Sequence, residues 1–215
     1  MKTLRPLGIA LLETPAFLLL PAARSAPTAP SLATAKVVDL THPFDEHTLS
    51  WPTSTAFSLT TLSAGQTPGG WFDSSNFFCA PEHGGSHVNA PHHFSEKGST
   101  AERIPLSRRI APAVVLDVRA KCAADADDRL ARPDAAKILV ADRRIAALGV
   151  DTASVDSGPS KDFPVHRIAG AADVPGFENV ANLESVPETG AWIVALPMMI
   201  AGGSGGPLRI VALLP

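Results

Sequence analysis

Histidines are concentrated in one short segment of this 215-residue chain. Four of the seven, His83, His87, His92 and His93, lie within residues 83–94, whose sequence is HGGSHVNAPHHF. Neutral imidazoles can bind zinc at about 2.0–2.1 Å, and a glycine-rich loop lets closely spaced histidines converge without a helix to present them. The composition therefore favours a metal site that includes His83 and His87, with a solvated histidine-rich turn as the alternative.

A second group of candidate ligands lies downstream. His166 is part of the run DFPVHR at residues 162–167, and Glu178 follows it by twelve residues. An imidazole and a carboxylate form a ligand set that suits zinc, manganese or iron. Taken alone, each has an ordinary structural interpretation: His166 as a partly buried histidine bonded to backbone, and Glu178 as a surface carboxylate.

Three aromatic side chains are candidates for substrate binding. Trp51, Trp71 and Phe72 could stack on a flat aromatic substrate, and each could equally be a core or interface aromatic. The chain has no tyrosine. General acid–base chemistry is therefore left to histidines and carboxylates.

The elements that must position these residues are short. Apolar, β-branched runs predict strands, several of them buried on both faces, at residues 37–40, 57–62, 77–78, 113–118, 191–196 and 208–214. Pro133, the spacing of Ile138, Ala141, Ile145 and Leu148, and a closing glycine predict an amphipathic helix that leads into a strand at residues 149–152. We therefore predict one mixed α/β domain with more strand than helix.

Composition excludes several classes of protein. Hydrophobic residues make up 45% and charged residues 18% of the chain, which is typical of a folded domain. The net charge of −3, without a basic cluster, argues against nucleic-acid binding and against an anionic membrane surface. The two cysteines, Cys79 and Cys122, are too few for a disulfide scaffold, and we expect Cys79 to be a buried thiol.

The N-terminus differs from the rest of the chain. Residues 1–26 begin with two basic residues, Lys2 and Arg5, which are followed by an interrupted apolar run and a small-residue segment, and this order predicts a signal peptide. We expect a linker at residues 27–35 and the functional domain at residues 36–215. The protein would be secreted or periplasmic if the signal operates and cytoplasmic otherwise. The apolar run is too short and interrupted for a transmembrane helix.

The histidine segment resembles a family signature. The pattern His83-x-Gly85-Ser86-His87-x-Asn89-x-Pro91-x-His93-Phe94 is similar to the HxGTHxDxPxHF signature of the metal-dependent cyclase-like hydrolases, which include bacterial kynurenine formamidases and isatin hydrolases. The similarity extends through VDLTHP at residues 38–43, GVDT at 149–152 and GGSGGP at 202–207. It therefore covers residues 36–215.

The resemblance implies roles for individual residues. Metal ligands would be His83, His87 and Asn89 at one position and His166 with Glu178 at a second, and His93 would transfer protons. The metal would be divalent, zinc or manganese. His42 and His92 would have supporting roles. The implied fold is a swivelling β/β/α domain on a mixed, barrel-like sheet, shortened in the middle, and the implied assembly is a homodimer.

The resemblance also implies an activity. A metal-activated water would cleave the amide, imide or lactone bond of a small cyclic or aryl substrate, with arylformamidase activity (N-formylkynurenine to kynurenine, in tryptophan catabolism) as the best single assignment. Two features depart from the pattern: Asn89 stands where the signature has Asp, and the segment between Val118 and Ile138 is short. The alternative is therefore a catalytically impaired metal-binding or interaction relative.

Overall fold

The computed structural model describes residues 28–120 and 132–215. Its strands are β1 (Lys36–Asp39), β2 (Ser58–Gln66), β3 (Phe72–Cys79), β4 (His87–Asn89), β5 (Ile110–Val114), β6 (Leu148–Gly149), β7 (Gly176–Glu178), β8 (Thr189–Pro197) and β9 (Gly205–Leu214). Its helical segments are α2 (Pro133–Lys137), α3 (Pro164–Ala171), the π-helical turn η4 (Ile138–Asp142), and the 3₁₀ turns η1 (Pro91–His93), η2 (Ala101–Arg103), η3 (Leu106–Arg108) and η5 (Leu183–Ser185).

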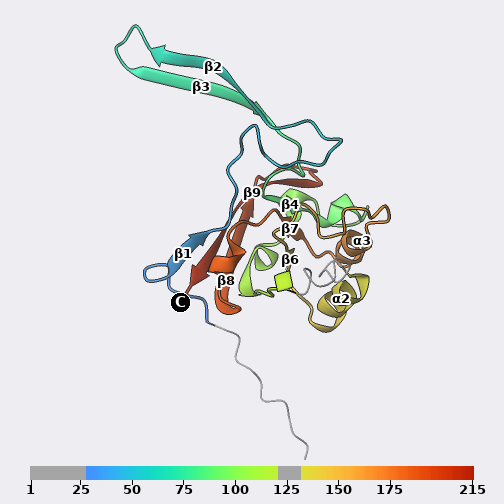
Figure 1. Ribbon diagram of the computed structural model, residues 1–215. Coiled ribbons are helices and arrows are strands. Elements are labelled where there is room, and N and C mark those ends of the chain that lie inside the picture. The colour runs from blue at the N-terminus through green and yellow to red at the C-terminus, as the bar shows by residue number, and fades with distance from the viewer. Residues whose placement is uncertain (1–27, 121–131) are drawn as a thin grey trace, which may run out of the picture.

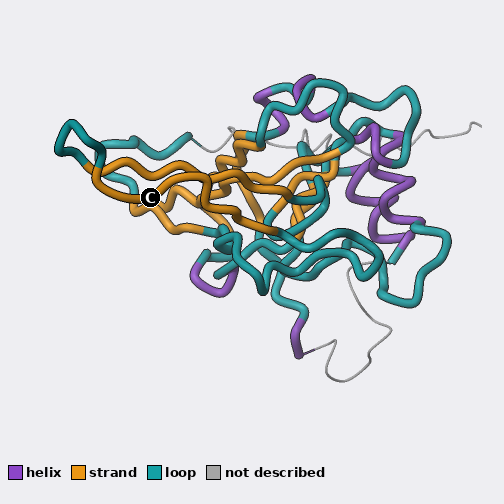
Figure 2. The backbone as a smooth tube through the Cα atoms, turned by 90° about the horizontal axis from the view of Figure 1, so that it is seen from above, coloured by secondary structure: helices purple, strands orange, loops and turns teal. Residues whose placement is uncertain are grey.

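One mixed sheet organises the body of the molecule. Its strand order is β5-β8-β9-β4-β7-β6, with β1 also paired to β9. All pairs are antiparallel except β6 with β7. The sheet curls into a half-barrel, and α2 and α3 lie together at one end of it (Figures 1 and 2). The predicted mixed α/β fold with a barrel-like sheet is confirmed.

The main core is built on this sheet. Leu40, Val88, Ile104 and Ile210 are fully buried there together with a row of small alanines from β8 and β9. A smaller cluster of Ala136, Val155 and Val165 joins α2 to α3. Both clusters stabilise the segments that carry the histidines, because burial of apolar side chains contributes about 1.5–3 kcal/mol for each large residue.

Most of the strand predictions are confirmed, with one wrong boundary. The runs at residues 37–40, 57–62, 77–78, 191–196 and 208–214 fall in β1, β2, β3, β8 and β9. The run at 113–118 is wrong, because β5 begins at Ile110 and ends at Val114. Beyond Val114 the Val115 amide still donates to Glu188 O, but the chain then leaves the ladder. The expected burial is also wrong for β2 and β3, whose residues are all exposed.

The predicted amphipathic helix is too long, because α2 ends at Lys137. The helix α2 widens into η4, where the Arg143 amide bonds to Ile138 O at 3.1 Å, and Arg144 then adopts a left-handed backbone with φ of 49°. A left-handed residue cannot continue a right-handed helix. Leu148, the last apolar residue of the predicted helix, lies in β6 instead. This strand has two residues, whereas a longer strand was predicted at residues 149–152.

Some predictions fall wholly or partly outside the described residues. These are the signal peptide at residues 1–26 and the central part of the short segment between Val118 and Ile138. Of the expected linker, residues 28–35 form an exposed stretch with a turn before β1. Within residues 28–120 and 132–215, no helix is long and apolar enough to span a bilayer.

Candidate functional site

Strand β4 places two of the predicted ligands on one face. Alternate residues of a strand point to opposite sides, so His87 and Asn89 share a face while Val88 enters the core. The antiparallel pairing of β4 with β7 puts His87 directly opposite Glu178. Two residues that are 91 positions apart therefore meet by strand register.

The ring of His87 is held in a defined orientation. Its Nδ1 lies 2.9 Å from Gly85 O and donates to it, which leaves the Nε2 lone pair free. Nε2 faces Glu178 Oε2 at 3.2 Å, is fully buried and has no hydrogen-bond partner. Gly85 has the positive φ that its glycine predicts, 59°, and a side chain there would collide with Phe44.

Helix α3 brings His166 to the same carboxylate. Pro164 begins the helix, and the buried Asp156 accepts hydrogen bonds from the backbone amides of Val165 and His166 in its first turn, which have no partner within the helix. Asp156 Oδ2 also accepts from His166 Nδ1 at 2.7 Å. His166 Nε2 consequently points at Glu178 Oε1, at 3.3 Å.

Sequence reasoning missed Asp156. No motif marks it, since it lies ten residues before His166 in a segment of serines and glycines. Its contacts show a positioning carboxylate, which fixes the tautomer and orientation of an imidazole as such groups do behind metal-binding histidines.

His83 has both ring nitrogens engaged. Nδ1 lies 2.6 Å from Asn89 Oδ1, and Nε2 lies 3.0 Å from Ser204 Oγ. Ser204 in turn donates its hydroxyl proton to Glu82 Oε2 at 2.6 Å. Because a hydroxyl has one proton, His83 Nε2 must donate to Ser204. No motif marks Ser204 or Glu82 as a partner of His83.

This chain of bonds fixes the role of Asn89. With Nε2 as the donor, His83 Nδ1 is an acceptor and needs a donor opposite it. The buried Asn89 Nδ2 has no partner. A half-turn of the amide group, which exchanges oxygen and nitrogen positions, pairs Nδ2 with His83 and leaves the amide oxygen as a free acceptor toward the site.

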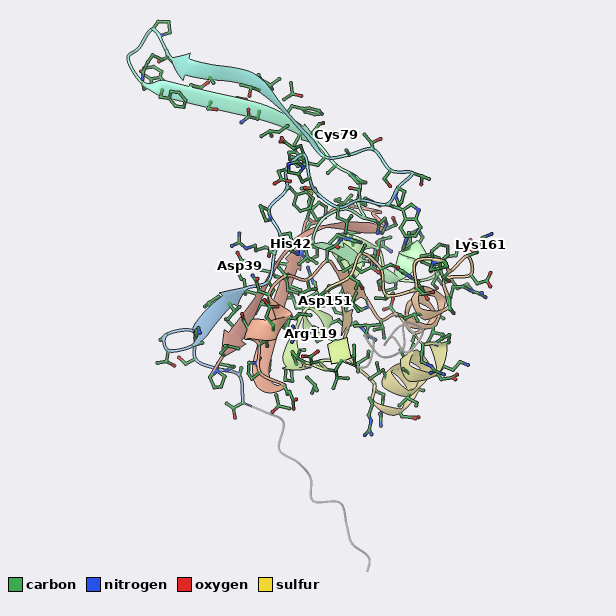
Figure 3. The ribbon with its side chains drawn as sticks, in the orientation of Figure 1. Asp39, His42, Cys79, Arg119, Asp151 and Lys161 are labelled. Carbon is green, nitrogen blue, oxygen red and sulfur yellow. The ribbon has the colours of Figure 1, made fainter. Side chains whose placement is uncertain are left out.

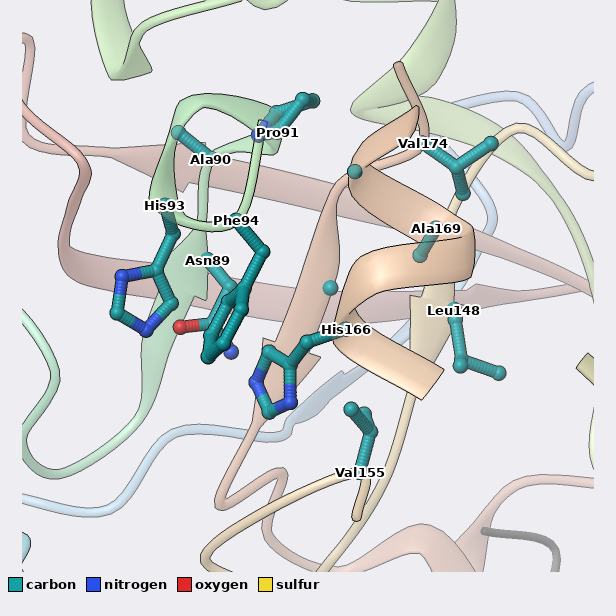
Figure 4. Close-up of a pocket in the computed structure, with 12 residues that line it drawn as sticks. Asn89, Ala90, Pro91, His93, Phe94, Leu148, Val155, His166, Ala169 and Val174 are labelled. Carbon is teal, nitrogen blue, oxygen red and sulfur yellow. The ribbon is translucent and has the colours of Figure 1, made fainter. Parts of the chain in front are cut away.

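His93 completes the cluster. Its ring stacks on His83 with centroids 3.9 Å apart and lies 5.8 Å from the ring of His166. Figure 4 shows His93, Asn89, Phe94 and His166 grouped at one side of a small pocket. Burial, followed by the neighbouring His83 and His166, lowers the pKa of His93 to about 3, so that its imidazole is neutral.

The charges of the cluster are set by Glu178. Burial opposes its ionisation, but hydrogen bonding with His166 and the contact with His87 outweigh burial and hold the pKa of Glu178 well below its usual range. Burial likewise opposes protonation of His166, but bonds to Asp156 and Glu178 outweigh it and raise the pKa of His166 to about 9. Burial and the nearby His87 lower the pKa of His83.

The donor set fits a divalent cation. Within the described chain, no group of three or more His, Cys, Asp or Glu side chains is arranged to hold a metal ion as it stands. His87 Nε2 nevertheless faces the carboxylate of Glu178, and a bound cation would satisfy both groups. Ligand atoms about 2.0 Å from a tetrahedral ion lie about 3.3 Å from one another, and Glu178 makes its two contacts at 3.2 and 3.3 Å.

Of the three aromatic residues predicted to bind substrate, one lies beside the site and two do not. Trp51 packs edge-on against Phe163 at 6.0 Å, and Phe163 lies 5.3 Å from Phe94, so Trp51 lies beside the site. The structure corrects the prediction for Trp71 and Phe72, which lie at the far end of the β2–β3 hairpin and not at the site of their own chain (Figure 1).

Three further residues with predicted roles are Cys79, His42 and His92. Cys79 is exposed at the base of the hairpin, which corrects the expected buried thiol (Figure 3). His42 contributes its backbone amide to Ser86 Oγ at 2.8 Å, a structural role. His92 lies in η1 beside His93 and makes its backbone bond to Ser99 O.

The pocket beside these residues is narrow and apolar. It lies between η1 and α3, and it has a cavity volume of about 20 Å³. Polar atoms reach it from Asn89, His93 and His166, while Leu148, Val155 and Val174 close its other side (Figure 4). A cavity of this volume has room for about one water molecule beside the polar groups.

The chain has recognisable relatives. Residues 38–134 match the family model described as "Putative cyclase". A kynurenine formamidase from Sphingopyxis alaskensis is 28% identical over 211 residues, which cover 82% of this chain and 97% of that protein.

Solved structures agree on the fold. Isatin hydrolase A from Labrenzia aggregata, solved with benzyl benzoate, has a TM-score of 0.74 at 24% identity, covering 85% of this chain and 96% of that one. A protein described as a predicted metal-dependent hydrolase from Bacillus stearothermophilus has a TM-score of 0.65 at 22% identity, covering 84% and 99%.

Proposed function

We propose that this chain is a cyclase-family hydrolase and that it cleaves the amide, imide or lactone bond of a small cyclic or aryl substrate. Arylformamidase activity is the best single assignment, because relatives at 24–28% identity are named kynurenine formamidase. The observation that carries the proposal is the convergence of His87 and His166 on the two oxygens of Glu178.

The residues that would hold a divalent metal, zinc or manganese, are His87, His166 and Glu178, with Asn89 and His83 completing the set. A bound divalent ion lowers the pKa of a coordinated water toward about 7 and polarises the carbonyl under attack. His83 contributes to the site through the bonds that hold Asn89, and its coordination of an ion requires release of one of its two ring nitrogens.

His93 is the group we assign to proton transfer. Its imidazole is neutral and therefore able to accept a proton from water and return it to the leaving nitrogen or oxygen. It is stacked on His83, which keeps its ring plane fixed beside the pocket. Trp51, with Phe163 and Phe94, forms an aromatic wall against which an aryl substrate would lie.

The test combines metal content with turnover. Purified protein should contain one to two equivalents of zinc or manganese by elemental analysis, and a His87→Ala/His166→Ala variant should lose them. The loaded protein should hydrolyse N-formylkynurenine or isatin, measured by absorbance. A folded protein that binds neither metal after loading would contradict the proposal.

The second candidate is an impaired relative, which the neutral side chain of Asn89 favours. Turnover of the Asn89→Asp variant distinguishes the two candidate functions. A marked gain in turnover supports a hydrolase scaffold. Absence of turnover with either residue, in folded and metal-loaded protein, favours the impaired relative.

The remaining assignments follow the same reasoning. We propose a small-molecule partner and neither nucleic acid nor membrane, in keeping with the net charge of −3. Export to the periplasm or outside the cell rests on the pattern of residues 1–26, and comparison of the mass of the mature protein with that of the full chain tests it.

A further inference from the structure

Arg109 is a buried cation without a counter-ion. It directly follows η3, and only 8% of its surface is exposed. Arginines are almost never buried to this degree unless a carboxylate pairs with them, because an unpaired ion loses its hydration. Among residues 28–120 and 132–215, no aspartate or glutamate forms an ion pair with Arg109. The described part of the chain therefore leaves this positive charge uncompensated.

The three nitrogen atoms of the Arg109 guanidinium have different surroundings. Nε is sealed from solvent and has no hydrogen-bond partner. Nη1 donates to Met199 Sδ at 3.4 Å, and a thioether is only a weak acceptor. Nη2 also lacks a hydrogen bond within the described chain, but it is not sealed as Nε is. The end of the guanidinium, formed by Nη1 and Nη2, is therefore available to a stronger acceptor.

Met199 contacts this end of the guanidinium and is easily displaced from it. Its side chain is 56% exposed, and an unbranched thioether changes rotamer readily. When Met199 turns aside, Nη1 and Nη2 become available together. A carboxylate accepts hydrogen bonds from such a pair of parallel N–H groups, one to each of its oxygens.

The loop that carries Met199 also bonds to two carboxylates. Glu102 accepts a hydrogen bond from the Gly202 amide at 3.1 Å, and Glu82 accepts one from the Ser204 hydroxyl at 2.6 Å. Both carboxylates therefore bond to the loop and not to the guanidinium. Because like charges repel, their negative charges oppose binding of a dianion such as phosphate more than binding of a monoanion.

We propose that Arg109 anchors a binding site for a small organic monocarboxylate, whose two oxygens accept hydrogen bonds from Nη1 and Nη2 in place of Met199 Sδ. The planar guanidinium matches the planar carboxylate and supplies the single positive charge that it needs. The choice of an organic acid rests on the proposed function, because hydrolysis of an amide, imide or lactone releases a carboxylate. The ligand class is therefore that of the reaction's own acid product.

This carboxylate site is separate from the histidine cluster. Within the described residues, no hydrogen bond or ion pair joins Arg109 to any histidine. The two sites are connected through the chain, because Met199 lies five positions before Ser204, whose hydroxyl is 3.0 Å from His83 Nε2. A carboxylate at Arg109 thus contacts one end of a loop whose other end supports His83.

The test is an NMR titration of the whole protein, labelled with ¹³C in its methionine methyl groups. The chain has three methionines, and Met198→Leu and Met199→Leu assign the two signals that matter. Sodium acetate is the probe, and sodium chloride at the same ionic strength is its control. Chelator is present throughout, so that acetate cannot bind to a metal.

We expect acetate to shift the Met199 signal saturably, with a Kd on the order of 1 mM, which ligand-efficiency limits allow for a ligand of this size. Met198 is the internal reference. It is the adjacent residue and is 45% exposed, but its sulfur makes no hydrogen bond within the described chain. Its signal should move no more with acetate than with chloride.

Arg109→Met and Arg108→Met are the matched variants. Arg109→Met removes the charge and should raise the Kd for acetate at least about 10-fold. Arg108 is half-buried and donates to Ala146 O at 3.2 Å, so Arg108→Met should leave the Kd unchanged. Arg109→Lys keeps the charge but lacks the planar fork, and it should also weaken binding. It replaces Arg109→Met in the test if that variant does not fold.

The stability of Arg109→Met tests the premise of an uncompensated charge. In buffer free of carboxylates, its melting temperature should exceed that of the wild type, because an apolar side chain replaces an unpaired buried ion. Acetate should raise the melting temperature of the wild type and not that of the variant. A folded Arg109→Met variant that melts below the wild type in this buffer would contradict the premise.

Three results of the titration would overturn the proposal. The first is no saturable shift of the Met199 signal up to about 100 mM acetate, roughly 100 times the expected Kd. The second is a shift that chloride reproduces or that persists in Arg109→Met. The third is tighter binding of inorganic phosphate than of acetate. Because the titration needs no turnover, a protein that binds acetate but hydrolyses nothing would retain this site and lose only the proposed function.

Discussion

Asn89 determines the charge balance of the candidate site. It is bonded to His83, shares a strand face with His87, and is 5% exposed. An amide can donate to His83 Nδ1, whereas a carboxylate cannot. The neutral side chain of Asn89 therefore favours the stability of the metal-free protein. It is also a weaker ligand for a cation than a carboxylate would be.

Asn89→Asp should consequently change stability in opposite directions with and without metal. In the presence of chelator the melting temperature should fall, because a second buried carboxylate would join Glu178 in the same cluster without a compensating charge. With zinc or manganese the variant should gain more in melting temperature than the wild type does. Thermal denaturation under both conditions measures this difference. Equal gains for the two proteins would contradict the role assigned to Asn89.

Asp156 is the second residue with a predictable effect. Asp156→Asn removes the charge behind His166 Nδ1 while keeping the shape of the side chain. Loss of such a supporting carboxylate lowers metal affinity by about 10–100-fold. Titration with Co²⁺, read by its visible absorption, measures affinity and ligand geometry together. The exposed Asp162→Asn is the control and should titrate like the wild type.

The close approach of β9 to the histidines depends on Gly205. It pairs with Asn89, and an added Cβ would lie 2.6 Å from both His83 Cε1 and Val88 O. A clash with backbone cannot be relieved by a side-chain rotation. Position 205 of β9 therefore requires glycine.

Gly205→Ala should destabilise the protein by about 1–3 kcal/mol, the usual cost of overpacking. At about 2–4 °C per kcal/mol for a chain of this size, the melting temperature should fall by several degrees. Gly158→Ala, where an added Cβ meets nothing within 4 Å, is the control. A variant at Gly205 as stable as the control would show that β9 moves freely.

The sequence predicts elements better than it predicts their surroundings. The apolar run of β9 and the two-residue spacing of His87 and Asn89 contain enough information to place a strand and one polar face. The exposure of β2 and β3 was not predictable, because an apolar strand looks the same whether its own chain or another one covers it. The end of α2 was missed because left-handed Arg144 carries no residue signal.

At the scale of the whole molecule, the site joins distant parts of the chain. Its proposed ligands come from β4, α3 and β7, which contact different neighbours in the fold. Any group that binds all three stabilises the folded state as a whole, because the unfolded chain cannot present them together.

Removal of metal should therefore lower the melting temperature of the entire domain in one transition. With metal at 100 times its Kd, binding contributes about 2.7 kcal/mol, which corresponds to about 5–10 °C. Calorimetry with and without chelator measures the shift. His166→Ala should abolish the dependence on chelator, and a shift that persists in this variant would place the metal elsewhere.

The central position of β9 has a consequence for biosynthesis. This strand pairs with β1, β4 and β8, and it is translated after every other described strand. A domain normally folds from its N-terminus while the ribosome is still working, but here the strand that carries His87 waits for its neighbour until residues 205–207 emerge. The nascent chain thus keeps an unpaired edge on β4 until β9 has been synthesised, and unpaired strand edges of this kind associate readily with other chains.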